Sequence, residues 1–205
     1  MRTGDVIDVV DGTGGWYRSR LDEVKKDEVS GTIVSRKTDV GEPDYDLTIG
    51  LALLKKPVRF ETFLEKAAEM GVRRVIPLIT ERTEKRHLRY SRSEHILIAA
   101  MKQCGRCRLV EMTEPMTFRS MLLEKKPEAA FICHEKNRPD EALTAMLPKI
   151  TKGLTILVGP EGGFTTKEVA AAHAEGYRPV SLGVRRLRAE TAAMVAATAV
   201  MLRYG

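Results

Sequence analysis

Two loops that carry glycine lie near the carboxyl end of the chain, at residues 159–163 and 182–188, and their residue types could hold a ligand. Glycine-rich loops often bind phosphate, but residues 159–163 lack the lysine and Ser/Thr of a P-loop and the spacing of the dinucleotide fingerprint. Glycines also let backbone groups approach a phosphate-free ring in a snug apolar slot. From the residues alone, the two loops are either such a slot or merely tight turns.

Arg188 and Glu190 come at the end of the second loop and could take part in chemistry. A guanidinium can stabilise negative charge that develops on a substrate oxygen. Glu190 stands at the start of an expected helix, where the helix dipole favours a carboxylate, so capping is its alternative role. No residue nearby is a clear general base, although Glu190 or a backbone group could accept a proton.

Basic residues gather in two further stretches of the chain. They are Arg82, Lys85, Arg86, Arg89, Arg92, Lys102, Arg106 and Arg108. A run of charges is usually a solvated surface, but such side chains can also contact phosphates and position an RNA. The stretch at 82–92 is so rich in cations that the RNA interpretation gains weight.

Cys104 and Cys107 form a C-x-x-C pair, which suggests a redox dithiol or half of a zinc site as an opposing hypothesis. The chain has no second C-x-x-C, and its four histidines show no ligand spacing. A thioredoxin-type motif opens a helix, whereas this pair closes an expected one. The sequence therefore favours neither thiol function, and we expect no metal.

The carboxyl-terminal elements are expected as a strand at 155–158, a helix opened by the capping box at 165–168 and ended by Gly176, a strand at 180–182 and a helix at 189–202. The last helix is small and apolar on every side, so we expect it to be buried all round. It is too short to span a membrane. Because so small a domain has little interior, the helix is expected to pack on a second subunit as well as on its own sheet.

Strands and helices alternate upstream of that region, which predicts a parallel sheet covered by helices on both faces. The expected strands lie at 47–54, 72–79, 109–112 and 129–133. The expected helices lie at 59–70, 93–102, 118–126 and 140–147. Ser91 to Glu94 offers a cap for the second of these helices.

Residues 1–44 are expected to form a small β module, and residues 45–205 the α/β domain. Strands at 6–10 and 16–21 flank a strong turn signal, and 28–36 could supply a third strand. A piece of this size is too small to be stable alone and must pack on the rest.

Composition narrows the class of protein. The 205 residues carry a formal net charge of +6 and a pI near 9.3, which favours a polyanionic partner. Only 5% of residues are aromatic, so base stacking is not the obvious mode of binding. Three cysteines and a start without a signal-peptide pattern lead us to expect the cytoplasm, with no membrane association.

Three motifs in this order resemble the RsmE family of 16S rRNA (uracil-N3)-methyltransferases, which belong to the SPOUT superfamily. They are LVGPEGG at 157–163, LG at 182–183 and LRAETA at 187–192. The likeness extends upstream to about Leu47 and less clearly to the amino terminus. Residues 103–106 match a family motif near the active site, while Val110 stands where the family often has proline.

The resemblance implies a SPOUT-type α/β domain whose carboxyl-terminal segment forms a trefoil knot, with the two glycine loops side by side and the final helix threaded behind them. It also implies a PUA-like β-barrel at the amino terminus that helps to grip RNA. The family usually has further strands upstream, so the barrel is expected to be truncated here. A homodimer that shares its active site across subunits is implied as well.

The resemblance also implies roles for individual residues. S-adenosylmethionine would contact Leu157, Gly159, Pro160, Glu161, Gly162, Leu182, Gly183, Leu187, Thr191 and Ala192. Catalysis would rest on Arg188, near the target base, and on Glu190. RNA would be bound by Arg82, Lys85, Arg86, Gln103, Arg106 and Arg108. His134 and Glu135 are expected either to line the first cofactor loop or simply to end a strand.

The expected function is methylation of N3 of a uridine in 16S rRNA or the small ribosomal subunit, with S-adenosylmethionine as methyl donor. One alternative is a protein that binds this cofactor and RNA without transfer, and another is a methyltransferase with a different RNA target. A dithiol oxidoreductase is the rival from a different class.

Overall fold

The computed structural model describes residues 1–124, 127–134, 141–149 and 151–205, and the chain separates into two compact units. The first unit combines Met1–Glu42 with Met101–Leu109. The second combines Pro43–Ala100 with Val110–Gly205. The RNA-binding and methyltransferase roles expected for the two parts of the chain stay predictions.

The first unit contains an antiparallel sheet of β1 (Val6–Val10), β2 (Gly15–Val24) and β3 (Val29–Thr38), with β2 in the middle. The turn between β1 and β2 is organised by Asp11, whose Oδ1 accepts hydrogen bonds from the N–H groups of Thr13 at 2.7 Å and Gly15 at 2.9 Å. All ten residues of β3 are exposed, so this sheet has little core of its own. The expected three strands are present, and the PUA-like character stays a prediction.

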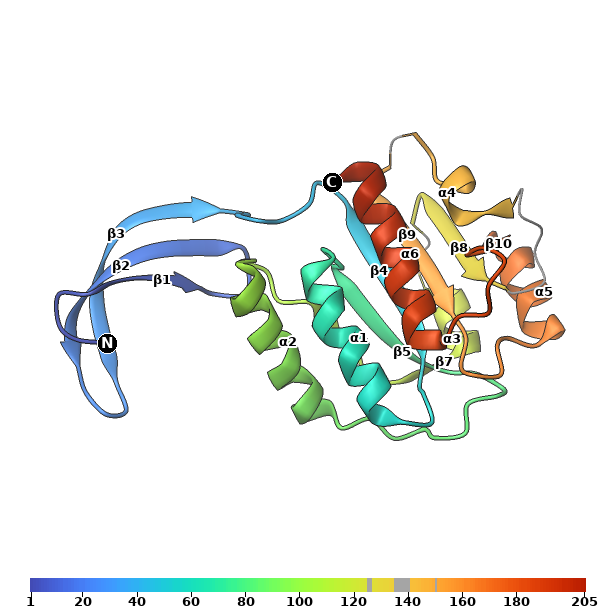
Figure 1. The fold of residues 1–205 in the computed structure, drawn as a ribbon, viewed down its shortest axis with the longest axis horizontal. Helices are drawn as coiled ribbons and strands as arrows, with labels where there is room; N and C mark the ends of the chain where they lie inside the picture. The colour runs from blue at the N-terminus through green and yellow to red at the C-terminus, as the bar shows by residue number, and fades with distance from the viewer. Residues whose placement is uncertain (125–126, 135–140, 150) are drawn as a thin grey trace. The chain divides into compact units, whose positions relative to one another are not determined.

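The second unit is built on a sheet in which every pair of strands is parallel, as the alternating pattern predicted (Figure 1). Its strands are β4 (Asp46–Ala52), β5 (Arg74–Ile79), β6 (Glu111–Met112), β7 (Met116–Thr117), β8 (Ala129–Cys133), β9 (Gly153–Val158) and β10 (Arg178–Val180). Their order is β10-β8-β9-β4-β5-β6, and β7 pairs with β5. Because the strands are parallel, the carboxyl ends of β8, β9 and β10 meet at one edge of the sheet.

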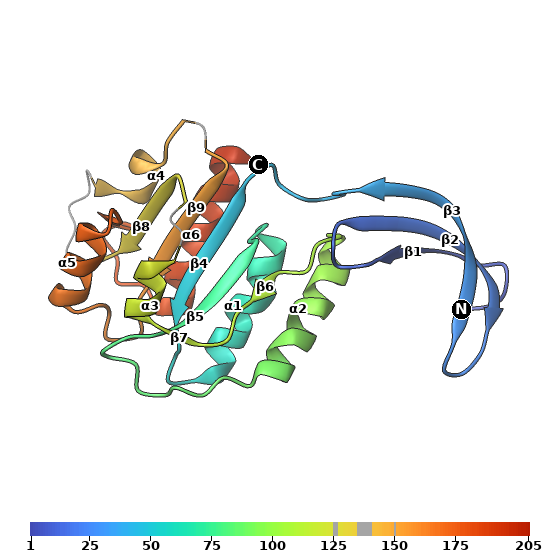
Figure 2. The same ribbon diagram turned by 180° about the vertical axis from the view of Figure 1, so that it is seen from behind.

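Helices cover both faces of this sheet (Figures 1 and 2). They are α1 (Pro57–Glu69), α2 (Tyr90–Cys104), α3 (Phe118–Leu123), α4 (Leu143–Met146), α5 (Thr166–Ala174) and α6 (Ala189–Tyr204). α1 and α6 pack together on one face. On the other face, Phe118 and Met121 of α3 and Ala172 of α5 share a buried cluster with Ile76 and Leu78 of β5.

Local signals fixed some element boundaries correctly and others not. The capping box of α5 is confirmed, since the Thr165 hydroxyl accepts from the Glu168 N–H at 3.2 Å and the Glu168 carboxylate accepts from the Thr165 N–H at 2.8 Å. The cap expected at Ser91–Glu94 is wrong, because α2 already begins at Tyr90.

Three other expectations need adjustment. The strand expected at 180–182 ends at Val180, since the backbone turns at Gly183 with φ +106°. β7 had no sequence signal that we recognised. The expected helices 118–126 and 140–147 reach Lys126 and Asp140, which lie outside the described residues.

Within this single chain the last helix is buried on one side only, and the expectation that a second subunit covers its other side stays a prediction. One side of α6 is buried through Ala193, Ala196, Ala197 and Val200. The other side is partly open, with 77% of Leu202 exposed, because a single sheet can cover only one side of a helix. Across the described residues, no helix combines the length and the apolar character that a membrane span requires.

Candidate functional site

A cavity of about 700 Å³ lies at the carboxyl edge of the sheet, where β8, β9 and β10 end. It is lined by Cys133 and His134 after β8, by 158–164 after β9 and by 181–189 after β10. The expectation that the two glycine loops lie side by side is therefore confirmed. Ligands of parallel α/β sheets bind at this edge, and the volume suits a small organic molecule.

The first loop needs glycine for its shape. A Cβ on Gly159 would lie 2.9 Å from the backbone nitrogen of Phe164 and 3.0 Å from the carbonyl carbon of Gly163, so any side chain would push the loop apart. The turn is closed by the Gly163 N–H, which donates to the Pro160 carbonyl at 2.8 Å. The missing side chain at Gly159 therefore lets the loop fold closely onto its own backbone.

The second loop brings arginines to the cavity. Its turn is set by Gly183, whose N–H donates to the Ser181 hydroxyl at 3.1 Å. Arg185, Arg186 and Arg188 are exposed and line the cavity. Arg188 is the N-cap residue of α6, but its side chain makes no capping hydrogen bond. Three guanidinium groups at the mouth give this site a positive character that suits an anionic partner.

Glu190 lies just inside α6 and is 7% exposed. Its Oε1 is 3.5 Å from Nε of Arg59, whereas its Oε2 is buried and has no hydrogen-bond partner. Leaving a buried carboxylate oxygen without a partner is costly, and Arg74 Nε and Ser93 Oγ are buried without a hydrogen-bond partner as well.

Arg59 of α1 also reaches the first loop. Its Nη1 is 3.6 Å from Oε1 of Glu161, and that same oxygen accepts a hydrogen bond from the Lys55 N–H at 3.2 Å. The guanidinium of Arg59 thus lies between a carboxylate of the first loop and one of α6. The sequence analysis missed this residue, because an arginine in the first turn of an amphipathic helix gives no signal that it contacts residues a hundred positions away.

Arg82 was expected to bind RNA, but the structure places it against the first loop. It lines the cavity and donates a hydrogen bond to the Gly162 carbonyl. Its neighbour Glu81 is fixed too, since the Glu81 N–H donates to Oε1 of Glu168 at 2.9 Å. Lys85 and Arg86 are exposed and do not line the cavity.

The structure brings most of the predicted site residues to one cavity. Those that line it are Arg82, Gly159, Pro160, Glu161, Gly162, Leu182, Gly183, Leu187, Arg188 and Ala192. Leu157, Thr191 and Glu190 do not line it, and Leu157 is fully buried in the core. His134 lines it, while Glu135 lies outside the described residues. The sequence analysis did not select Arg185 and Arg186, although three arginines within four residues could have been the signal.

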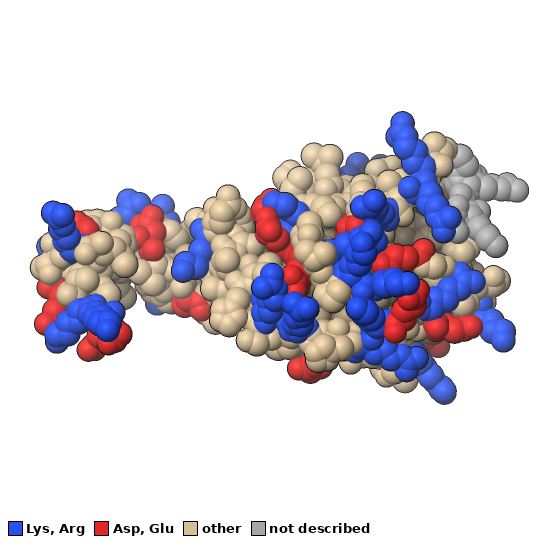
Figure 3. All heavy atoms as spheres, turned by 60° about the horizontal axis from the view of Figure 1, so that its bottom comes forward, with Lys and Arg blue, Asp and Glu red and all other residues tan. Residues whose placement is uncertain are grey.

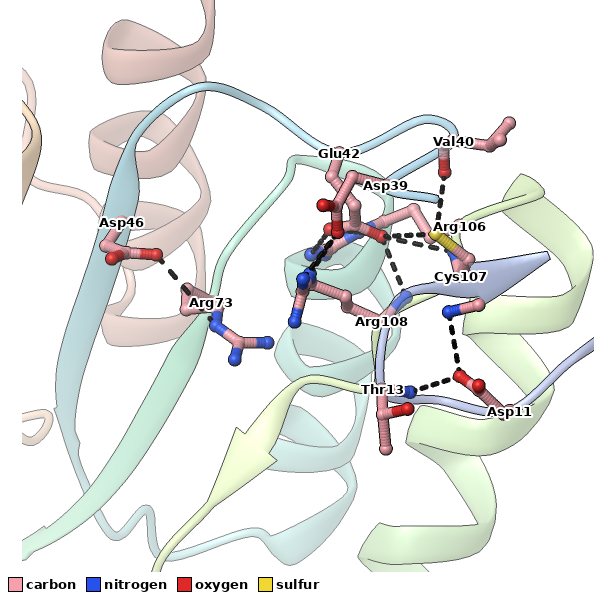
Figure 4. A network of polar contacts seen from close by, with 11 residues as sticks. Asp11, Thr13, Asp39, Val40, Glu42, Asp46, Arg73, Arg106, Cys107 and Arg108 are labelled. Carbon is pink, nitrogen blue, oxygen red and sulfur yellow. Dashed lines mark hydrogen bonds and ion pairs between the residues drawn. The ribbon is translucent and has the colours of Figure 1, made fainter. Parts of the chain in front are cut away.

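Arg106 was also expected to contact RNA, and the structure gives it a different position (Figure 4). It is 4% exposed, and its Nη2 lies 2.7 Å from Oε2 of Glu42. Oε1 of Glu42 accepts further hydrogen bonds from the N–H groups of Cys107 at 3.1 Å and Arg108 at 2.8 Å. A guanidinium held in this way cannot reach a phosphate, so we correct its role to a structural one inside the first unit.

The remaining candidates for RNA binding differ in exposure. Arg108 pairs with Asp39, with 2.6 Å between its Nε and Oδ1, and this hydrogen bond raises the pKa of Arg108. Gln103 is exposed. Figure 3 shows one face of the molecule, where Lys and Arg side chains are interspersed with Asp and Glu. The face shown is thus mixed in charge.

The C-x-x-C pair has no features of a redox site. All three cysteines are free. The Cys107 thiol is buried and donates to the Val40 carbonyl at 3.2 Å, and burial together with Glu42 raises its pKa. Burial raises the pKa of the Cys133 thiol to about 12. Thiols protonated in this way are poor nucleophiles. Among the described residues, no three His, Cys, Asp or Glu side chains are grouped to hold a metal ion.

Known proteins are similar to this chain in sequence and in fold. A family model described as an RNA methyltransferase domain matches residues 41–201. The ribosomal RNA small subunit methyltransferase E of Synechocystis sp. is 33% identical over 203 residues, which cover 96% of this chain and 65% of that protein. The chain therefore spans just under two thirds of the length of this relative.

Two solved structures are similar over the whole chain. A probable rRNA-methyltransferase from Porphyromonas gingivalis has a TM-score of 0.91 at 28% identity, covering 100% of this chain and 87% of that one. The ribosomal RNA small subunit methyltransferase E of Neisseria gonorrhoeae, solved bound to S-adenosyl methionine, has a TM-score of 0.90 at 27% identity and covers 100% and 86%.

Proposed function

Because this chain belongs to the RNA methyltransferase domain family, we propose that it transfers a methyl group from S-adenosylmethionine to N3 of a uridine in 16S ribosomal RNA. The resemblance to the RsmE family that the motifs indicated is confirmed by the relatives of that name. One observation carries the proposal: both glycine loops line a single cavity that has three arginines at its mouth.

The cavity fits S-adenosylmethionine on two grounds. Its volume of about 700 Å³ lies within the range of small-molecule sites, and both loops whose motifs resemble the RsmE family line it. The proposed contacts are Gly159, Pro160, Glu161, Gly162, Leu182, Gly183, Leu187 and Ala192. When bound, this cofactor supplies an electrophilic methyl group on a sulfonium. Leu157 and Thr191 do not line the cavity and are left out of the proposed contacts.

Two residues of the chain would handle the charge and the proton of the target base. The N3–H bond of uracil must break as the N–C bond forms, and negative charge then spreads to the flanking carbonyl oxygens. Arg188, exposed at the mouth, would stabilise that charge. Glu190 does not line the cavity, so we propose that its carboxylate, which has one buried oxygen without a partner, accepts the proton through one intervening water molecule.

RNA contacts would come from cationic and polar side chains at or near the surface. We propose Lys85, Arg86, Gln103 and Arg108 for this role, with Arg82 acting through its contact with the first loop. Arg106 is excluded by its buried pair with Glu42. The β sheet of the first unit would serve as a truncated PUA-like module, and the loops with α6 as a SPOUT knot. A cytoplasmic location stays a prediction.

The open side of α6 supports the proposed homodimer. It carries a continuous stripe at helical spacing, made of Thr191, Met194, Val195, Thr198 and Leu202. Such a stripe is the pattern by which two helices pack. The substitution Val195→Glu is expected to halve the mass seen by sedimentation at equilibrium, whereas Val184→Glu in the exposed second loop should leave it unchanged. A monomeric wild-type protein would refute the dimer.

Transfer itself can be tested on undermodified small-subunit rRNA. Purified protein and labelled S-adenosylmethionine should place label in the rRNA, and mass spectrometry of the digested nucleosides should find 3-methyluridine. A ribose-methylated product or a methylated position on another base would point to another target. Binding of the cofactor and RNA without any labelled nucleoside would instead support a binding protein without transfer.

A further inference from the structure

We propose that Arg59 is a positioning residue that fixes the first loop and the start of α6 relative to one another. The inference rests on the proposed function, because it concerns the same cavity. Arg59 itself does not line the cavity, so it would act through Glu161 and Glu190 and would not touch the ligand.

Three segments far apart in sequence meet at this guanidinium. Nη1 of Arg59 faces Oε1 of Glu161 at 3.6 Å, and Nε faces Oε1 of Glu190 at 3.5 Å. Two different nitrogen atoms of the planar Arg59 guanidinium therefore each face one carboxylate. A guanidinium can do this because its N–H groups form a rigid fork, whereas a lysine presents one compact charge.

The two carboxylates depend on this cation to different degrees. Glu161 also accepts a hydrogen bond from the Lys55 N–H, and 35% of its side chain is exposed. The side chain of Glu190 is only 9% exposed, and its second oxygen has no partner. Arg59 is the one cation paired with Glu190 among the described residues. Loss of Arg59 would therefore affect Glu190 more than Glu161.

The contacts are looser than hydrogen bonds. Charge-assisted hydrogen bonds measure about 2.7–2.9 Å, so both contacts of Arg59 leave room to shorten. Contacts in unliganded catalytic sites often tighten when the substrates bind. Arg59 can thus hold the two segments together by charge while they adjust to a ligand.

Helix packing does not need this arginine. α1 is anchored on α6 and the sheet by its buried apolar side chains Phe60, Phe63, Leu64 and Ala67, whereas the Arg59 side chain is 25% exposed. Removal of the charge should therefore leave α1 in place and change only the positions of Glu161 and Glu190 relative to one another.

The test compares Arg59→Met, which keeps an unbranched apolar stem, with Arg59→Lys and with the control Arg74→Met. Arg74 also lies between two glutamates, at 3.2 Å from Glu111 and 3.4 Å from Glu124, and its side chain is 29% exposed. It sits at the amino end of β5 and does not line the cavity. For each variant the experiment measures cofactor affinity by calorimetry, the single-turnover rate of rRNA methylation and the melting temperature.

We expect Arg59→Met to lower the single-turnover rate by about 10- to 100-fold, since small misplacements of reacting groups cost rates of this order. Arg59→Lys should recover part of the rate, and Arg74→Met should match wild type in rate and affinity. In a Glu190→Gln background, Arg59→Met should cost much less, because the group that it positions no longer carries a charge. Should Arg59→Met fail to fold, Arg59→Gln takes its place.

Equal rates for Arg59→Met, Arg74→Met and wild type would overturn the proposal, as would the same fold loss with and without Glu190→Gln. If wild-type protein methylates no rRNA, the proposed function fails separately. Cofactor affinity then decides the role of Arg59, because an unchanged affinity in Arg59→Met would exclude any effect on the first loop.

Discussion

Two arginine–carboxylate contacts in this protein differ in how completely the carboxylate is hydrogen-bonded. In the first unit, Glu42 pairs with buried Arg106 at 2.7 Å, and its other oxygen accepts two backbone N–H groups. In the second unit, Glu190 faces Arg59 at 3.5 Å and keeps one buried oxygen without a partner. The first arrangement satisfies every strong acceptor it buries, while the second leaves one open.

The difference separates a structural carboxylate from a functional one. A satisfied buried network fixes a single conformation, and it matters here because the sheet of the first unit has a fully exposed strand, β3. Burial without a partner does not by itself mark function, because Arg74 Nε and Ser93 Oγ share it, so we distinguish Glu190 by its position next to Ala189, which lines the cavity. Four substitutions test whether this distinction holds.

The largest effect is expected for Glu42→Ala. It leaves the guanidinium of Arg106 buried without a carboxylate, which should cost about 3–5 kcal/mol in the free energy of unfolding of the first unit. Fluorescence of Trp16, the single tryptophan of the chain, reports on that unit during urea unfolding. The matched control is Asp8→Ala, which breaks the exposed pair with Arg18 and should cost far less than Glu42→Ala. Equal losses for the two variants would contradict the structural role of Glu42.

Glu190→Gln should give the reverse pattern. The rate of methyl transfer is expected to fall about 100-fold, equivalent to about 2.7 kcal/mol, because the amide cannot accept a proton. Stability should hardly change, since the substitution also removes a poorly satisfied charge. Paired measurements of single-turnover rate and urea midpoint check this. A stable fold with an undiminished rate would remove Glu190 from the proposed mechanism.

Glu168→Ala sharpens the comparison within the second unit. Glu168 is nearly as buried as Glu190, but it accepts hydrogen bonds from the N–H groups of Thr165 at 2.8 Å and Glu81 at 2.9 Å. Loss of this capping box should lower the free energy of unfolding by about 1–2 kcal/mol. The rate at saturating cofactor should stay near wild type, measured on the folded protein. A rate loss as large as that of Glu190→Gln would erase the distinction between the two glutamates.

The smallest effect is expected at Asp11, a satisfied carboxylate on the surface. Hydrogen bonds from the N–H groups of Thr13 and Gly15 lower its pKa in the folded state. A lowered folded-state pKa adds stability above the unfolded value near 3.9 and loses it as pH falls below that value. Between pH 5 and pH 2, a range that brackets the ordinary pKa of an aspartate, wild type should therefore lose more free energy of unfolding than Asp11→Asn. Thermal unfolding of both proteins, followed by Trp16 fluorescence across this pH range, checks the prediction. An equal loss in the two proteins would contradict it.

Sequence signals predicted the parts of the site that local geometry determines. The glycines of the first loop, the capping box at Thr165 and the loop after β10 all act within a few residues, so their residue types identify them. The parallel sheet followed from the alternation of strands and helices. That both glycine loops line one cavity was implied by the resemblance to the RsmE family and did not follow from these local features.

Contacts between distant residues could not be predicted in the same way. Arg59 and Arg106 each look like an ordinary surface cation, yet one lies between two loops of the site and the other is buried against Glu42. Which side of α6 would stay open could not be predicted for a related reason. An apolar helix does not reveal which of its sides the chain's own sheet covers.

Cys133 lines a cavity that we propose to hold a reactive sulfonium. Burial raises the pKa of its thiol to about 12, so the thiol is protonated at neutral pH and is a poor nucleophile toward such a compound. The burial that makes Cys133 a poor nucleophile would therefore prevent transfer of the methyl group to the protein's own thiol. A more exposed thiol at the end of β8 would be open to methylation by the bound sulfonium compound.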